Sequence, residues 1–179
     1  MRLCLVSDTH RFRHELLMAV KAAQPVDAVI HAGDETADAA WLAERVRWPV
    51  LGVAGNWDSA SDHFPEERVL TSFGPVLLVT HGHRDRVKGG LADLRARADR
   101  TGAQIVVFGH THRAMAVFED GVLFVNPGSL SSPRGRRERT FALLEITANP
   151  TGYDVRVSHW TVTGHMISDS LLTAAISAK

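Results

Sequence analysis

The chain opens with MRLCLVSDTH (residues 1–10), in which a short apolar run ends in polar side chains. The run is too short for the apolar core of a signal peptide, so residues 2–7 predict a first β-strand. Asp8 and His10 follow it two positions apart. In an extended segment, side chains at this spacing point to the same side and can reach a common ligand.

Four further polar motifs each follow a predicted strand. They are Gly33-Asp34, Gly55-Asn56-Trp57-Asp58, His81-Gly82-His83 and Gly109-His110-Thr111-His112. The carboxyl ends of the strands form the ligand-binding edge of an open α/β sheet, so five such motifs can converge on one crevice. Each interval between successive motifs has about the length of a strand, a connection and the return to the same sheet edge, which supports this convergence.

The remaining pattern predicts an α/β fold. Apolar residues at helical spacing predict helices over 13–23, 36–46 and 90–100. Apolar runs predict strands over 26–31, 50–54, 68–73, 76–80 and 104–108, and then over 114–118, 122–125, 140–146 and 153–161. Gly74-Pro75 and Asp120-Gly121 predict hairpin turns. We expect one domain over 1–165 and a C-terminal helix or tail over 166–179.

Composition excludes several classes of protein. With 179 residues, 45% of them hydrophobic and 22% charged, the chain has the composition of an average soluble globular domain. Its 20 basic and 20 acidic residues cancel, so it lacks the basic excess of non-specific nucleic-acid binders. Its apolar runs are too short to span a membrane. The single Cys4 lies in an apolar run and predicts a buried thiol, which favours a reducing, cytoplasmic compartment.

The five motifs have the chemistry of a metal site. They offer carboxylates, imidazoles and an amide oxygen without a thiolate, a set that suits Mn, Fe, Zn, Ni or Co. One ion that must also hold water and substrate cannot use so many ligands, so the pattern predicts two divalent ions sharing a carboxylate. The candidate ligands are Asp8, His10, Asp34, Asn56, His81, His110 and His112.

The ordered set of motifs resembles that of the calcineurin-like metallophosphoesterases, and most closely that of the small YfcE-type prokaryotic phosphodiesterases. The shared motifs are Ser7 to His10, Thr80 to His83, Gly109 to His112 and Asn126 to Ser129. The resemblance covers residues 2 to about 160. It implies a four-layer α/β/β/α sandwich of two mixed β-sheets flanked by helices. It also implies a metal-dependent phosphoric ester hydrolase, a phosphodiesterase or phosphatase acting on a small phosphate ester.

Position by position, the resemblance implies that Asp8, His10 and His112 hold a first ion and that Asn56, His81 and His110 hold a second. Asp34 would bridge them. The implied nucleophile is a hydroxide shared by the two ions, so no protein nucleophile is needed. Manganese is the expected metal, with zinc, iron, nickel and cobalt as alternatives.

Two departures from the family pattern concern the substrate. Trp57 occupies the position at which larger members carry a histidine that protonates the leaving group, so the chain offers no certain side-chain acid. Arg11 replaces a common glycine, and a guanidinium beside the ions can grip a phosphate. Phosphate contacts or support of the ligands are expected from Arg11, Asp58, His83 and Arg134, and backbone donors of the Asn126–Ser129 turn are a further candidate.

Two other functions are compatible with the same fold. One is a scaffold or binding subunit that has lost catalysis, and the intact set of seven ligands argues against it. The other is a nuclease with the same metal centre, which the small size and zero net charge disfavour because gripping a polymer normally needs a basic groove.

Members of the family often associate, so a homodimer or homotetramer is also expected.

Overall fold

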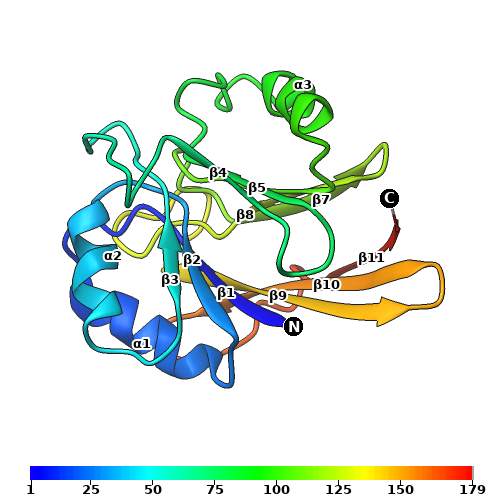
Figure 1. The fold of residues 1–179 in the computed structure, drawn as a ribbon. Helices are drawn as coiled ribbons and strands as arrows, with labels where there is room; N and C mark the ends of the chain where they lie inside the picture. Colours follow the sequence, from blue (N-terminus) through cyan, green and yellow to red (C-terminus); the bar gives the residue numbers. More distant parts are fainter. Residues whose placement is uncertain (179) are drawn as a thin grey trace.

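The computed structural model describes residues 1–178, and its strands form two mixed sheets (Figure 1). The first sheet has the order β11-β10-β9-β1-β2-β3, and the second has the order β4-β5-β6-β8-β7. The first contains β1 (Arg2–Val6), β2 (Ala28–His31), β3 (Val50–Gly52), β9 (Thr140–Asn149), β10 (Gly152–Thr161) and β11 (Leu172–Ser177). The second contains β4 (Glu67–Leu70), β5 (Leu77–Thr80), β6 (Ile105–Val107), β7 (Met115–Glu119) and β8 (Val122–Asn126).

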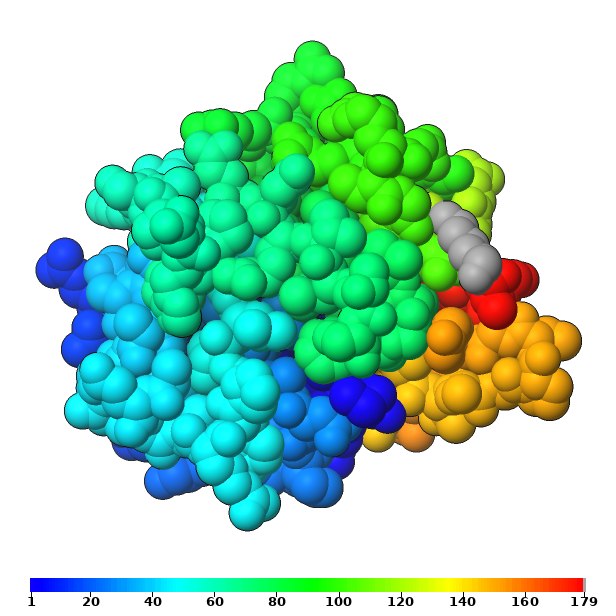
Figure 2. Space-filling model, in the orientation of Figure 1, coloured from blue at the N-terminus to red at the C-terminus, as the bar shows by residue number. Residues whose placement is uncertain are grey.

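Three helices cover the outer faces of these sheets. Helices α1 (Arg13–Ala23) and α2 (Thr36–Ala43) lie on the first sheet, and α3 (Ala92–Thr101) lies on the second (Figure 1). The result is the expected four-layer sandwich. The space-filling view shows the β9–β10 segment, in orange, standing out from the body at the lower right (Figure 2).

The layers follow from strands that are apolar on both faces. In β1, Leu3 and Leu5 pack between the sheets, whereas Cys4 and Val6 pack under the helices. Strand β6 repeats the pattern, with Ile105 turned toward the other sheet and Val106 toward α3. Successive side chains of a strand point to opposite faces, so a strand buried on both faces must be apolar throughout.

Strand direction brings the polar motifs together. Strands β1, β2 and β3 run parallel in the first sheet, and β5 and β6 run parallel in the second. Each of these five strands ends just before one of the five motifs. The motifs therefore lie at the carboxyl ends of parallel strands, where α/β sheets form their binding crevices.

The C-terminal prediction was wrong. A helix or tail was expected over 166–179, but Leu172–Ser177 form β11, which pairs antiparallel with β10. Leu172, Ala174 and Ile176 of this strand pack on the core between the sheets, whereas Ala175 faces outward. The apolar Ala175 on the outer face hides the two-residue period.

Several element ends also differ from the prediction. Helix α2 ends at Ala43 rather than at residue 46, and β4 covers Glu67–Leu70 rather than 68–73. Val46 lies beyond the last turn of α2 but still packs on the core beneath the helices. Because its apolar side chain continues the helical spacing, the predicted helix was too long. The Asp120-Gly121 hairpin is confirmed, with φ values of +46° and +77°. Among residues 1–178, no helix has the length and apolar character needed to cross a membrane.

The buried thiol of Cys4 generates a test of the fold. Its side chain is fully buried, and burial raises its pKa to about 12. A rise of three units reduces the thiolate fraction by about 1,000-fold, and the thiolate is the reactive form. We expect iodoacetamide to leave the native protein unlabelled and to label it after unfolding in urea, as measured by mass spectrometry. Rapid labelling of the folded chain would mean that β1 is accessible.

Candidate metal centre

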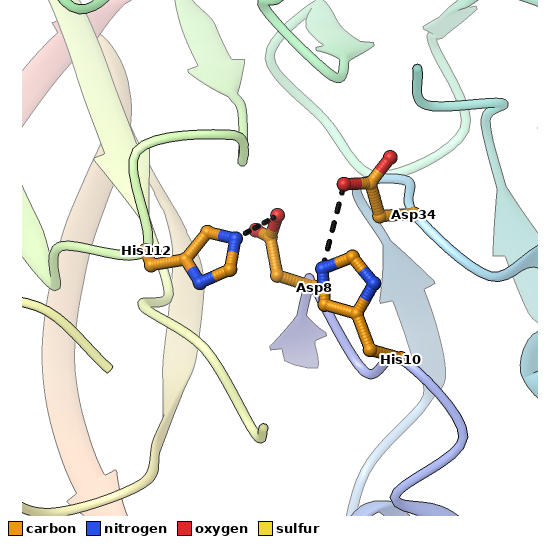
Figure 3. A group of neighbouring side chains, drawn as sticks. All are labelled: Asp8, His10, Asp34 and His112. Carbon is orange, nitrogen blue, oxygen red and sulfur yellow. Dashed lines mark ion pairs between the residues drawn. The ribbon is translucent and has the colours of Figure 1, made fainter. Parts of the chain in front are cut away.

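Four predicted ligands gather into a first group where the two sheets meet (Figure 3). One donor atom from each of Asp8, His10, Asp34 and His112 lies within 4.8 Å of the others. Nε2 of His112 is 3.1 Å from Oδ1 of Asp8, and Nε2 of His10 is 3.5 Å from Oδ2 of Asp34. Such spacing suits side chains that surround a common cation.

The other three predicted ligands form a second group. Oδ1 of Asn56 lies 3.2 Å from Nε2 of His81 and 3.0 Å from Nδ1 of His110. Oδ1 of Asp34 lies 3.3 Å from the same Nε2 of His81. Asp34 therefore turns Oδ2 toward the first group and Oδ1 toward the second.

The carboxylate of Asp8 provides a test of whether a cation fits. It is fully buried, and its Oδ2 accepts hydrogen bonds from Oγ of Ser7 (2.7 Å) and from the backbone N–H of His110 (3.1 Å). Its Oδ1 accepts none from the described residues, although His112 is close. A buried charged oxygen without a hydrogen bond is costly, and a metal ion between Oδ1 and the ring nitrogen relieves that cost.

Backbone carbonyls orient two of the imidazoles. Nδ1 of His81 lies 2.8 Å from the carbonyl oxygen of Ala32, and Nδ1 of His112 lies 2.7 Å from that of Ser132. A carbonyl oxygen only accepts, so Nδ1 carries the hydrogen in both rings. The lone pair of a neutral ring is then on Nε2, the atom that faces the carboxylates, as in histidines that bind metals.

The electrostatics of the site favour positive charge. Burial lowers the pKa of His81 and of His112, but the adjacent carboxylates, Asp34 for His81 and Asp8 for both, outweigh it and raise both above the ordinary value. Burial raises the pKa of Asp34, but its contact with His81 reverses this and lowers it. The two carboxylates thus stabilise a cation between them, whether a proton or a metal ion.

The ligand loops have an uncommon backbone conformation. Nine non-glycine residues among the described ones have positive φ, and five of them are predicted ligands: Asp8, His10, Asp34, His110 and His112. This left-handed region is disfavoured for residues with a Cβ and is concentrated at functional sites. Two glycines allow the loops to pack closely, since a Cβ at Gly109 would lie 2.0 Å from Oγ of Ser7 and one at Gly55 2.1 Å from Oδ1 of Asp34.

Asp38 supports the first ligand loop, and the sequence prediction missed it. This fully buried carboxylate accepts hydrogen bonds from Oγ1 of Thr9 (2.8 Å), the backbone N–H of Arg11 (2.8 Å) and Nε of Arg13 (2.7 Å). It therefore holds both neighbours of His10. The available signal was a carboxylate between two alanines in the first turn of the helix predicted over 36–46.

The Asn126–Ser129 turn supports the ligands instead of offering donors to a phosphate. All four of its residues are buried, and the N–H of Gly128 donates to Oδ1 of Asn126. Nδ2 of Asn126 donates to the carbonyl of Gly109 (2.8 Å), and the hydroxyls of Ser129 and Ser131 both donate to the carbonyl of Asp8 (2.9 Å each). The expectation of backbone phosphate donors here is therefore wrong.

The other predicted residues lie around the ligands. Oδ1 of Asp58 accepts from the N–H of Thr36 at the start of α2, and its Oδ2 accepts from the N–H of Gly55, so Asp58 ties two ligand loops together. The ring of His83 is 5.4 Å from that of His81, and its Nδ1 is buried without a hydrogen-bond partner among the described residues. Arg11 is exposed and pairs with Glu35 at 3.4 Å.

An open pocket of ≈ 530 Å³ adjoins the first group of ligands. His10, His112, Trp57, Arg11 and Arg134 are among the residues that line it. Trp57 is 73% exposed, and its ring meets that of His10 edge to face at 5.6 Å. A molecule bound beside His10 would thus contact an indole and two guanidinium groups.

Replacing Asp38 tests whether it positions the ligands. Asp38→Asn preserves the shape but removes the charge that three donors share, so we expect the free energy of unfolding to fall by about 1–3 kcal/mol. We also expect Mn²⁺ affinity to fall about 10- to 100-fold, because the loop around His10 loosens. Urea unfolding and calorimetric titration measure the two effects. The control is Asp154→Asn, an exposed carboxylate on β10. Unchanged Mn²⁺ affinity would contradict the positioning role.

Comparisons with known proteins agree with this geometry. The probable metallophosphoesterase YsnB of Bacillus subtilis is 37% identical over 147 residues, which cover 82% of this chain and 85% of YsnB. The phosphodiesterase YfcE of Escherichia coli K12 is 33% identical over 117 residues, or 58% of each chain. The crystal structure of a predicted phosphoesterase from Streptococcus pneumoniae TIGR4 matches 97% of this chain and 96% of its own, with a TM-score of 0.75 and 27% identity. The calcineurin-like phosphoesterase superfamily domain matches residues 1–149, and the chain belongs to that superfamily.

Proposed function

We propose that this protein is a phosphodiesterase that hydrolyses small phosphate diesters with two divalent metal ions, manganese being the expected metal. The observation that carries the proposal is the position of Asp34, whose Oδ2 faces His10 of the first group and whose Oδ1 faces His81 of the second. The first ion would be held by Asp8, His10 and His112, and the second by Asn56, His81 and His110. A carboxylate shared in this way is typical of sites that hold two ions.

The chain's own residues hold and orient the reacting groups. When bound, the two ions supply Lewis-acid activation of a water molecule and neutralise charge on the phosphate oxygens. Asp8 and Asp34 provide the negative charge that attracts the ions, and His81 and His112 present fixed lone pairs. Arg11 and Arg134, at the rim of the adjoining pocket, are available to the non-bridging oxygens of the phosphate.

Trp57 sets the choice of leaving group. Its indole lies beside His10 in the position of the family's acid, and an indole cannot donate a proton to a departing oxygen at neutral pH. A leaving group must then depart as an anion, which favours esters of acidic alcohols and phenols. The exposed ring also offers a flat apolar surface to an aromatic leaving group.

Hydrolysis of bis(p-nitrophenyl) phosphate by chelator-treated protein with Mn²⁺ added back tests the proposal. We expect turnover that requires the metal and that Asp34→Asn lowers by about 100-fold, because one carboxylate serves both ions. Elemental analysis should show the variant losing bound manganese. Asp154→Asn, far along β10, is the matched control and should behave like the wild type.

The outcome also separates the alternative functions. A folded wild type that binds manganese but hydrolyses no ester would overturn the proposal and favour a scaffold or binding subunit. Faster cleavage of single-stranded DNA than of the small diester would favour a nuclease. Activity that survives Asp34→Asn intact would contradict the shared-carboxylate arrangement.

Replacing Trp57 tests its effect on leaving groups. In the wild type, kcat/KM should fall steeply from ethyl p-nitrophenyl phosphate to ethyl phenyl phosphate, since the phenol is less acidic. Trp57→His restores a group able to donate a proton, and general acids contribute about 10²- to 10⁴-fold. We expect at least the lower part of that gain for the phenyl ester alone. Trp57→Phe keeps an aromatic ring without the acid, so its kcat/KM should fall between the two esters as steeply as that of the wild type. An equal fall in kcat/KM in all three proteins would refute this role of Trp57.

A further inference from the structure

We propose that a second pocket beside the metal centre binds a further anionic group, so that the preferred substrate is a phosphodiester with a phosphate or carboxylate on the group that is not expelled. This inference rests on the proposed function and names the substrate class of the same site. The pocket has a volume of ≈ 580 Å³. It is lined by Val87, Lys88, Gly89, Gly90, Leu91, Thr111, Arg113, Met115 and Arg134.

The charged side chains that line this pocket are all cationic. Lys88, Arg113 and Arg134 line it, and no acidic residue does. None of the three forms an ion pair with any described residue, whereas ten arginines elsewhere pair with carboxylates. In a chain with equal numbers of acidic and basic residues, three unpaired cations around one hollow attract an anion.

Two residues of the pocket link it to the site. Thr111 lies between the predicted ligands His110 and His112 in the sequence, and Arg134 lines this pocket as well as the one beside His10. The backbone N–H of Arg134 donates to the carbonyl of His112 at 2.9 Å.

The two pockets divide the substrate between them. The pocket beside His10 contains the exposed Trp57 ring and suits the leaving group, whereas the second pocket combines its cations with the apolar side chains of Val87, Leu91 and Met115. A short carbon chain ending in an anion matches that lining. Three cations in one hollow suit one further anionic group, while a nucleic-acid strand needs an extended basic groove.

Three esters with one leaving group test this specificity. They are the ethyl, 2-carboxyethyl and 2-phosphonoethyl p-nitrophenyl phosphates, which differ only in the charge at the end of the retained group. We expect kcat/KM for the two charged esters to exceed that of the ethyl ester by about tenfold, the effect of two exposed charge contacts. Added salt should reduce the ratio, because exposed charges are screened. A higher kcat/KM for the phosphonoethyl ester alone would narrow the preferred anionic group of the substrate to phosphate.

A double variant and a matched control assign the effect to the pocket. In Lys88→Met/Arg113→Gln the ratio of charged to uncharged ester should fall below about twofold. In Lys21→Met/Arg100→Gln, which removes the same charges from exposed positions on α1 and α3, the ratio should remain at the wild-type value. A wild-type ratio near one, or a ratio that the double variant leaves intact, overturns the proposal while the diesterase function stands.

Binding decides the question independently of turnover. Calorimetry on the manganese-loaded protein should show ethane-1,2-bisphosphonate binding about tenfold more tightly than ethylphosphonate, and the double variant should remove the difference. Equal affinities in the wild type overturn the pocket's role whether or not any ester is hydrolysed. Hydrolysis of none of the three esters, with the binding difference intact, contradicts the proposed function and leaves an anion-binding pocket established.

Discussion

Two carboxylates, Asp8 and Asp34, are buried where the two sheets meet, and the rest of the site is organised around their charge. Burying negative charge is costly unless opposite charge and hydrogen bonds compensate it. Here compensation comes from imidazoles on three different loops and from backbone N–H groups of His110 and Trp57. The same charge that makes the folded chain hard to stabilise makes the site attractive to a divalent cation.

The geometry around the carboxylates is maintained by buried hydrogen bonds behind the ligands. Left-handed backbone at a residue with a Cβ costs about 1–3 kcal/mol, and several ligand residues have it. Asp38 holds the loop after β1, Asn126 holds the loop after β6, and Asp58 joins the loops after β2 and β3. Stability and function are therefore linked, because the residues that support the loops also set the positions of the donor atoms.

The sequence predicted the layers and the ligand positions better than the supporting contacts. Strands such as β1 and β6 are apolar on both faces, and a polar motif directly after them marks the sheet edge. Asp38 was not predictable in this way, because its role depends on partners such as Thr9 that lie 29 residues away and meet it only in the folded chain. Strand β11 was missed because Ala175 weakens its alternation, and the turn after β8 was misassigned because burial of its N–H groups is a tertiary property.

The position of β1 has a consequence for synthesis of the chain. It lies inside its sheet, between β2 and β9, and its pairing with β9 joins residues 2 and 145. A nascent chain that has not reached β9 leaves one side of β1 without its partner, and such edges promote association with other chains. The hydroxyls that hold the Asp8 carbonyl also come from residues 129 and 131. Asp8, the first of the predicted ligands to be synthesised, is therefore among the last to reach its final position.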